Sequence, residues 1–350
     1  LQSSAYDLKS PYFGCYNNIK AEFMNILLSI PDSKLPVLNY GGTQRVVWYL
    51  AKELHKMGHR VTLLAAPGSE CSFADVVHYR QGVPIAEQIP QGIDILHCQN
   101  FVEESVADFP HVVTMHGNTL GVKLDKNTVF VSRNHAERHG SGCYVYNGMD
   151  WDDYGTVDLG AQRDYFHFLG KAAWKVKNVK GAIDVAKAMP GARLKVLGGY
   201  RFNFKMGWRF TFSPRISFYG MVGGERKSSL LNGSKGLIFP VTWDEPFGLA
   251  ITESLYFGAP VFGTPYGSLP ELVNKEVGFL TDEREKMAAH IINDYHYSPK
   301  VCHEYAVDEF NSRLMAERYV QKYEQVLNGK TLNNRCPEAT VPYSHRLWKK

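Results

Sequence analysis

The stretch GLIFPVTWDEPFGLAITESLYFGAPVFGTPYGSLPELV, from Gly236 to Val273, decides the fold. Two short apolar runs, at residues 236–241 and 260–263, are bounded by turn residues, as buried strands of a parallel sheet are. The residues between them predict a helix over Gly248–Phe257. A strand, a helix and a second strand in this order form a βαβ unit, so the stretch predicts a parallel sheet covered by helices.

The same alternation extends towards both ends of the chain. In the first half, the strand-like MNILLSI begins at Met24, and a glycine loop and an amphipathic run over residues 43–57 follow it. Further apolar runs are GIDILHC, HVVTMHG and TVFVSRN. After the turn-rich VYNGMDWDDY at residues 145–154, a second series of strands and helices begins at Tyr165. We therefore predict an α/β protein of two doubly wound, Rossmann-like domains in tandem.

This pattern divides the chain into five parts. Residues 24–155 form the first domain and residues 156–306 the second. A helix over residues 307–328 is expected to pack back towards the first domain, and residues 329–350 form a tail. We interpret residues 1–23 as a leader or cloning remnant, with Met24 as the natural start, because they show no clear period.

Composition excludes several classes of protein. None of the apolar runs reaches the roughly 20 residues that span a bilayer, and the start of the chain lacks the pattern of an export signal. The six cysteines show no CxxC pair, which indicates reduced thiols. These features predict a cytoplasmic protein, with peripheral contact at the inner face of a membrane kept open. A net charge of +4 is too weak to indicate nucleic acid, but it suits an anionic ligand.

Two carboxylates in the deciding stretch are candidates for a ligand site. Glu245 is expected in the loop after a strand, and Glu253, eight positions on, in the second turn of the next helix. Backbone N–H groups of Phe247, Gly248 and Leu249 lack partners at the start of that helix and can bind a diphosphate or sugar hydroxyls. Gly248 also permits close approach of the backbone.

This segment resembles the E-x7-E region of retaining GT-B glycosyltransferases, the large family four (glycosyl transferases group 1) in particular. The resemblance implies that Glu245 contacts the donor sugar and that Glu253 hydrogen-bonds the nucleotide ribose. The alternative is a pair of solvated carboxylates at a helix end. The intact EPFGLAITES and the following GTPYGSLPE favour the first interpretation.

A second resemblance lies in FHFLGKAAWKVKNVKGAIDVAKAM, where the family has a basic residue after a strand and a Lys-Gly pair opening a helix. It implies that Lys171 and Lys180 bear the growing charge of the departing diphosphate. The chain departs from the family pattern, because the first basic residue is normally arginine and the loop here is longer. Lys177 is therefore an alternative to Lys180, and we interpret Lys175 as a solvated loop charge.

The first domain supplies the opposite wall of the implied site. Gly41 and Gly42, in NYGGTQRVVWYL, resemble the family's glycine loop that approaches the donor phosphates and sugar. His116, at the end of VVTMHG, resembles the histidine that lines the sugar pocket, with a structural histidine as the alternative. Asn147 and Gly148 resemble the segment that enters the linker, and we interpret them as structural.

The resemblance covers about residues 24–325 and implies the whole activity. It implies a retaining glycosyltransferase of the hexosyl type, whose first domain takes the acceptor and whose second binds a nucleotide-diphosphate-sugar. It implies neither a metal nor a further cofactor. The acceptor would be a carbohydrate or lipid-linked molecule in glycan, lipopolysaccharide or polysaccharide biosynthesis. The alternatives are an epimerase or phosphorylase of the same architecture and a non-catalytic sugar-nucleotide-binding module. A Rossmann oxidoreductase is disfavoured because no GxGxxG follows a strand.

Two other segments carry charge or aromatic residues without a clear role. The cluster Asp150, Asp152 and Asp153 could resemble a metal-binding acidic motif, but its place at the linker favours exposure to solvent. The segment YRFNFKMGWRFTF, residues 200–212, interleaves aromatic and basic residues. It suits a membrane or nucleic-acid surface, or a hairpin that buries one face, which we prefer.

Overall fold

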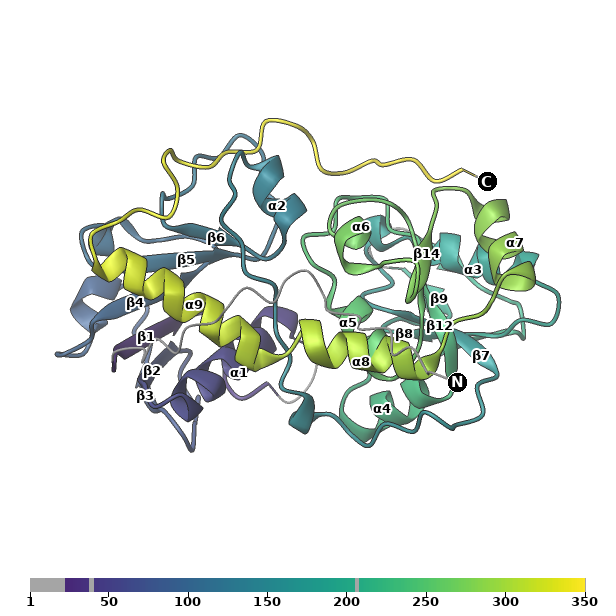
Figure 1. Ribbon diagram of the computed structural model, residues 1–350, viewed down its shortest axis with the longest axis horizontal. Helices are drawn as coiled ribbons and strands as arrows, with labels where there is room; N and C mark the ends of the chain where they lie inside the picture. The colour runs from purple at the N-terminus through teal and green to yellow at the C-terminus, as the bar shows by residue number, and fades with distance from the viewer. Residues whose placement is uncertain (1–22, 38–40, 205–207, 350) are drawn as a thin grey trace, which may run out of the picture.

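Two parallel six-stranded sheets form the framework of the computed structural model, which describes residues 23–37, 41–204 and 208–349 (Figure 1). Their strand orders are β3-β2-β1-β4-β5-β6 and β11-β8-β7-β12-β13-β14. Each sheet thus has the doubly wound order 3-2-1-4-5-6, which confirms the predicted fold class. In such a sheet, ligands bind where the strand order reverses, at the carboxyl ends of the strands.

The N-terminal domain is built from alternating buried strands and covering helices. Its strands are β1 (Asn25–Ile30), β2 (Arg60–Ala65), β3 (Asp75–His78), β4 (Ile95–Gln99), β5 (His111–Met115) and β6 (Thr128–Phe130). Its helices include α1 (Gly42–Lys56) and α2 (Arg133–Arg138), with short 3-10 turns at Ile85–Gln88 and Glu104–Val106. Five of the six β1 residues are buried, as strands covered on both faces require.

The C-terminal domain repeats this arrangement. Its sheet contains β7 (Tyr165–Leu169), β8 (Leu194–Leu197), β11 (Ile216–Phe218), β12 (Ser234–Phe239), β13 (Val261–Gly263) and β14 (Gly278–Leu280). The covering helices are α3 (Val179–Ala188), α4 (Gly224–Asn232), α5 (Leu249–Tyr256), α6 (Leu269–Leu272), α7 (Arg284–Asn293) and α8 (Pro299–Glu309). Short 3-10 turns lie at Trp151–Asp153, in the linker, and at Lys175–Lys177, between β7 and α3.

Helix α9 (Ser312–Leu327) carries the chain back to the N-terminal domain, where it packs against α1 (Figure 1). Its Tyr323 hydroxyl lies 2.7 Å from Nδ1 of His97, and its Tyr319 hydroxyl lies 2.6 Å from Oγ1 of Thr114. These polar atoms are buried, so each needs the partner that the other element supplies. The contacts fix α9 on the N-terminal sheet.

The segment after α9 runs along the molecule from the N-terminal domain, past α2, to the region of α7 (Figure 1). At one end, the Asn333 amide donates to the backbone oxygens of Lys126 and Thr128. At the other, the carbonyl of Tyr343 accepts a 2.7 Å hydrogen bond from the backbone of Asp244, whose carboxylate binds Arg346. The tail is therefore a strap that joins both domains.

A small hairpin, β9 (Phe202–Asn203) and β10 (Arg209–Phe210), projects from the C-terminal domain. The sequence analysis preferred a hairpin that buries one face, and the structure shows the hairpin with one face turned to the domain. The aromatic side chains are exposed, whereas Arg201 and Arg209 face the domain and bind backbone oxygens and the Phe218 ring. Backbone carbonyls at the base of the hairpin favour the guanidinium groups over the rings.

Cys71, Cys98, Cys143, Cys302 and Cys336 are free thiols. Among the residues that the structure describes, no helix combines the length and the apolar character needed to cross a bilayer.

Candidate functional site

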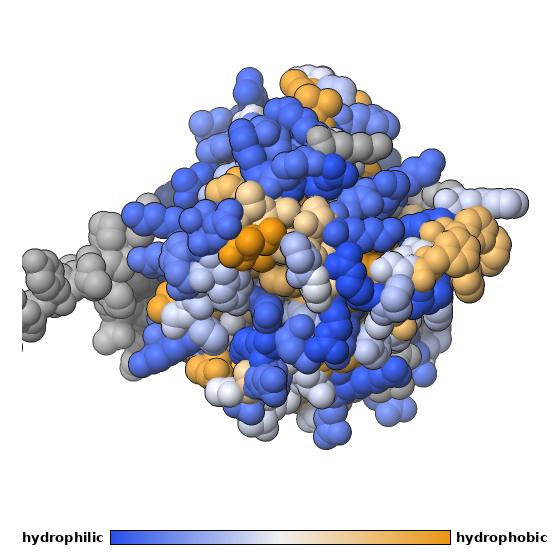
Figure 2. Space-filling model, turned by 90° about the vertical axis from the view of Figure 1, so that its right-hand side faces the viewer, coloured by the Kyte–Doolittle hydropathy of each residue, from blue (hydrophilic) through white to orange (hydrophobic). Residues whose placement is uncertain are grey.

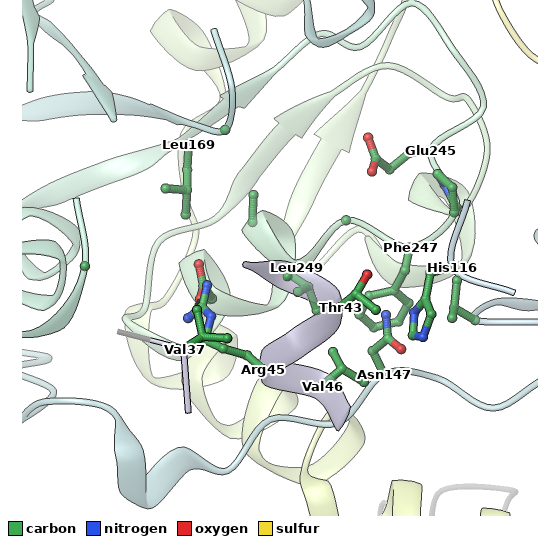
Figure 3. A pocket seen from close by; sticks show the side chains of 18 of the residues that line it. Val37, Thr43, Arg45, Val46, His116, Asn147, Leu169, Glu245, Phe247 and Leu249 are labelled. Atoms are coloured by element: carbon green, nitrogen blue, oxygen red, sulfur yellow. Dashed lines mark hydrogen bonds and ion pairs between the residues drawn. The ribbon is translucent and has the colours of Figure 1, made fainter. Parts of the chain in front are cut away.

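A cavity of about 640 Å³ lies between the two domains, at the carboxyl ends of their strands. From the N-terminal domain it is lined by the start of α1 and the loop after β5, and from the C-terminal domain by the loops after β7 and β12 and the start of α5. Figure 3 shows Thr43 of α1 beside Leu249, where α5 begins, and Phe247, whereas the Arg45 side chain lies on the other side of α1. The site is thus built where both sheets reverse their strand order.

Glu245 lies in the loop after β12, on the wall of the cavity. Its Oε2 is 2.5 Å from Nζ of Lys177 and accepts a 2.8 Å hydrogen bond from Nε1 of Trp243. The Lys177 ammonium also lies 5.0 Å from the Trp243 ring and 5.3 Å from the Phe239 ring. A carboxylate and an ammonium held by rigid aromatic neighbours offer the cavity both an acceptor and a cation.

Glu253, on α5, is the centre of a buried charge cluster at the same cavity. Its Oε1 lies 2.7 Å from Nζ of Lys227, 3.0 Å from Nη1 of Arg45 and 2.7 Å from the Tyr154 hydroxyl. Burial alone would raise the pKa of Glu253, but Lys227 and Arg45 outweigh it and lower the pKa to about 2. The carboxylate is therefore ionised, and it joins α1, α4, α5 and the linker.

The start of α5 supplies backbone donors to the cavity. Gly248 precedes the helix with a φ of 91°, a left-handed conformation that strains any residue with a Cβ. The first N–H groups of the helix, from Leu249 and Ala250, have no intrahelical partner, and both residues line the cavity. The Phe247 ring is instead buried among Tyr146 and Phe310. Phe247 thus serves the site through its backbone.

The N-terminal domain closes the cavity with His116 and Gly42. Burial lowers the pKa of His116 to about 4, so the imidazole is neutral near pH 7, with Nε2 2.7 Å from the Gln99 amide oxygen. A Cβ on Gly42 would lie 3.2 Å from Cδ1 of Leu249, so this glycine lets the two domains approach. Gly41, which precedes α1 as its N-cap, is buried and does not line the cavity. The loop residues Asn39 and Tyr40 lie outside the described residues.

Part of the chain is similar to a known protein family. Residues 158–306 match the family model described as glycosyl transferases group 1. The matched residues lie in the C-terminal domain, which is therefore similar to this family.

Solved glycosyltransferases share the fold of most of the chain. A glycosyltransferase involved in avilamycin A biosynthesis, AviGT4, superposes with a TM-score of 0.72 at 24% identity, covering 88% of this chain and 99% of that one. Alr3699/HepE of Anabaena, solved with UDP and glucose, superposes with a TM-score of 0.63 at 16% identity, covering 86% and 100%. A Klebsiella pneumoniae protein described as an uncharacterized 41.2 kDa protein in the cps region is 28% identical over 116 residues, 31% of this chain and 32% of its own length.

The lysines between β7 and α3 are arranged differently from our first expectation. Lys180 faces outward, where its Nζ lies 2.7 Å from the Asp184 carboxylate. Lys171 is also exposed, and its Nζ lies 5.3 Å from the centre of the Trp174 ring. Neither lines the cavity, whereas Lys177 does. The cause is local: Asn178 adopts a left-handed conformation and caps α3, so the preceding turn points Lys177 inward and the first turn of α3 points Lys180 away.

The structure adds cavity residues that the sequence analysis missed. Arg45 and Lys227 each follow a pair of glycines by a few residues, and this spacing indicates a cation near a ligand-binding loop. No pattern in the sequence, however, predicted that both cations contact Glu253. Tyr154 and Asn147 also line the cavity, although Asn147 was interpreted as structural.

The acidic cluster at the linker faces solvent only in part, because Asp152 and Asp153 are exposed as expected but Asp150 is not. Asp150 is buried and pairs with Lys52 of α1 at 2.5 Å, and Asp153 lies 3.1 Å from the same ammonium. The cluster therefore fixes the linker on α1. Within the described ranges, no group of three or more His, Cys, Asp or Glu residues is arranged to hold a metal ion.

Proposed function

We propose that this glycosyltransferase moves a hexosyl group from a nucleotide-diphosphate-sugar to an acceptor with retention of configuration and without a metal. One observation carries the proposal: Glu245, Lys177 and the N-terminus of α5 share one wall of the interdomain cavity. A cation beside unpaired N–H groups suits a diphosphate, and a carboxylate next to them suits sugar hydroxyls.

Each group has a role in this scheme. Lys177 and the first N–H groups of α5 would stabilise the charge that develops on the leaving diphosphate, as a metal ion does in other enzymes. Glu245 would release Lys177 to the phosphate and accept hydrogen bonds from the sugar. Glu253 would hydrogen-bond the ribose from within its cluster with Arg45 and Lys227. Neutral His116 would contact the sugar from the opposite wall.

In the proposed reaction, the bond between the anomeric carbon and the diphosphate oxygen breaks through an oxocarbenium-like state. The acceptor oxygen bonds to the anomeric carbon on the face that the diphosphate leaves, and its proton passes to the leaving phosphate oxygen. The leaving phosphate thus acts as the base, and the reaction needs no further one.

The nature of the substrates is inferred from the relatives. The Anabaena structures contain UDP and UDP-glucose, which supports a UDP-hexose as a donor class. The location of the Klebsiella protein in a cps region supports a role in polysaccharide biosynthesis, with a carbohydrate or lipid-linked acceptor.

A thermal-shift screen against nucleotide sugars tests the donor, because a ligand of the folded state raises the melting temperature. Product analysis by NMR then tests the chemistry. We expect the retained anomer, with transfer persisting in excess chelator and falling greatly in Glu245→Gln. An inverted anomer would overturn the retaining mechanism, and transfer lost to chelator and restored by magnesium would overturn metal independence.

A further inference from the structure

The β9–β10 hairpin presents its apolar face to solvent. Its aromatic side chains occupy alternate positions and are between 46% and 79% exposed: Tyr200, Phe202, Phe204, Trp208, Phe210 and Phe212. The rings contact one another across the strands, with centroid separations of 5.7 Å for Phe204 and Phe210 and 6.0 Å for Phe202 and Phe210. Apolar residues also gather in a projection at the right-hand edge of the face drawn in Figure 2. Contiguous exposed aromatic surface of this kind marks an interaction site.

The orientation of the hairpin is held by specific contacts. Arg201 donates to the carbonyl oxygens of Thr211 and Ile216 at 2.8 and 2.7 Å, and Arg209 donates to the carbonyl of Tyr200 at 3.0 Å. The Arg209 guanidinium lies 5.0 Å from the Phe218 ring. Two of these contacts, with the Ile216 carbonyl and the Phe218 ring, reach β11 outside the hairpin. Turning the aromatic face inward would break them, so the exposure of this face is a built feature.

A cationic hollow lies directly beside the aromatic face. It has a volume of about 480 Å³, and Trp208 and Phe210 of the hairpin form part of its wall. Its lining holds four cations, Lys175, Lys180, Lys187 and Arg209, against one carboxylate, Asp184. Asp184 already pairs with Lys180. The hollow therefore offers an excess of positive charge next to exposed rings.

We propose that the hairpin and this hollow dock the C-terminal domain onto an anionic phospholipid bilayer. Aromatic residues partition into the headgroup region, where Trp is enriched, and the lysines attract acidic headgroups. A second copy of the chain fits less well, because a two-fold contact would bring the cationic hollows of both copies together. The hollow shares Trp174 with the interdomain cavity, but none of the residues substituted below lines that cavity, so each proposal can fail without the other.

Vesicle sedimentation of the full chain tests the proposal. We expect binding to vesicles of phosphatidylcholine mixed with phosphatidylglycerol and little binding to phosphatidylcholine alone. The double variant Trp208→Ser/Phe212→Ser should weaken binding at least about tenfold, because it removes two rings that the bilayer would cover. Lys187→Glu should weaken it by about fivefold or more.

Matched controls separate the surface from general effects. Ile292→Ser, which removes a side chain that is 54% exposed on α7, and Lys300→Glu on α8 should bind as the wild type does. The thermal shift given by a nucleotide sugar should be unchanged in all four variants, which shows that the fold and the donor site survive. Equal binding of the hairpin double variant and the wild type to the anionic vesicles would overturn the proposal. So would a stable dimer in solution that the hairpin variants dissociate.

Discussion

Replacing Glu253 with glutamine tests the charge cluster that joins the domains. The carboxylate is 3% exposed and contacts two cations, Lys227 and Arg45, which are themselves mostly buried. Glutamine keeps the shape and can still accept the hydrogen bond from Tyr154, but it leaves both cations without a counter-charge. We therefore expect the fold to be destabilised while the packing is retained.

The loss of folding free energy follows from the burial of the ion pair and from the pKa of Glu253. Removing one partner of a buried ion pair costs about 3–5 kcal/mol of folding free energy. Separately, the pKa of Glu253 falls from its ordinary 4.5 to about 2, a difference of about 2.5 units, which corresponds to about 3 kcal/mol. Because the folded-state pKa is depressed, this contribution is complete above pH 4.5 and is lost as the pH falls towards 2. Glu253→Gln should therefore cost about 3 kcal/mol of folding free energy near neutral pH.

Denaturant unfolding of the ligand-free protein measures this loss. The gap between wild type and Glu253→Gln should be about 3 kcal/mol at pH 7 and should narrow as the pH falls below 4.5. Adding Lys227→Met should recover a large part of it, because the remaining Arg45 is 20% exposed and can turn to water. The exposed Glu304→Gln, which breaks a 3.7 Å pair with Lys300, should cost under about 0.5 kcal/mol. A loss below about 1 kcal/mol in Glu253→Gln, or a gap that does not change with pH, would refute the reasoning.

Three further outcomes are expected. Lys177→Met should lower kcat for sugar transfer by roughly 10²–10³-fold, whereas Lys180→Met should keep a kcat near that of the wild type. The reason is that, of these two lysines, Lys177 lines the cavity and Lys180 does not. Equal losses of kcat in steady-state assays would contradict this assignment. Gly148→Ala should destabilise the fold by about 1–3 kcal/mol in thermal unfolding, because the added Cβ would lie 2.3 Å from the carbonyl oxygen of Asn311. An unchanged melting temperature would show that the backbone at Asn311 moves aside without cost. The His116 ring should show no NMR titration near neutral pH, because burial lowers its pKa to about 4; an inflection near 6.5 would mean that the imidazole is hydrated.

Local sequence determined most of the fold. Apolar runs of strand length alternating with helical periods predict two doubly wound sheets, because each element's burial follows from its own spacing. The same holds for the stretch from Gly236 to Val273, where strand, loop and helix place Glu245 and Glu253 at the end of a sheet. These features depend on neighbours in the chain.

Tertiary structure alone decided which charges meet. Arg45 and Glu253 are 208 positions apart, and only the packing of α1 against α5 makes them partners. The backbone of Asn178 turned Lys177 towards the cavity and Lys180 away from it. The alternation in residues 200–212 gives the hairpin an aromatic face and a basic face. The Ile216 carbonyl and the Phe218 ring beneath the hairpin bind the arginine side chains, so the basic face packs on the domain and the aromatic face is exposed to solvent. Periodicity fixes what an element can bury, whereas the surface that it meets fixes which face it does bury.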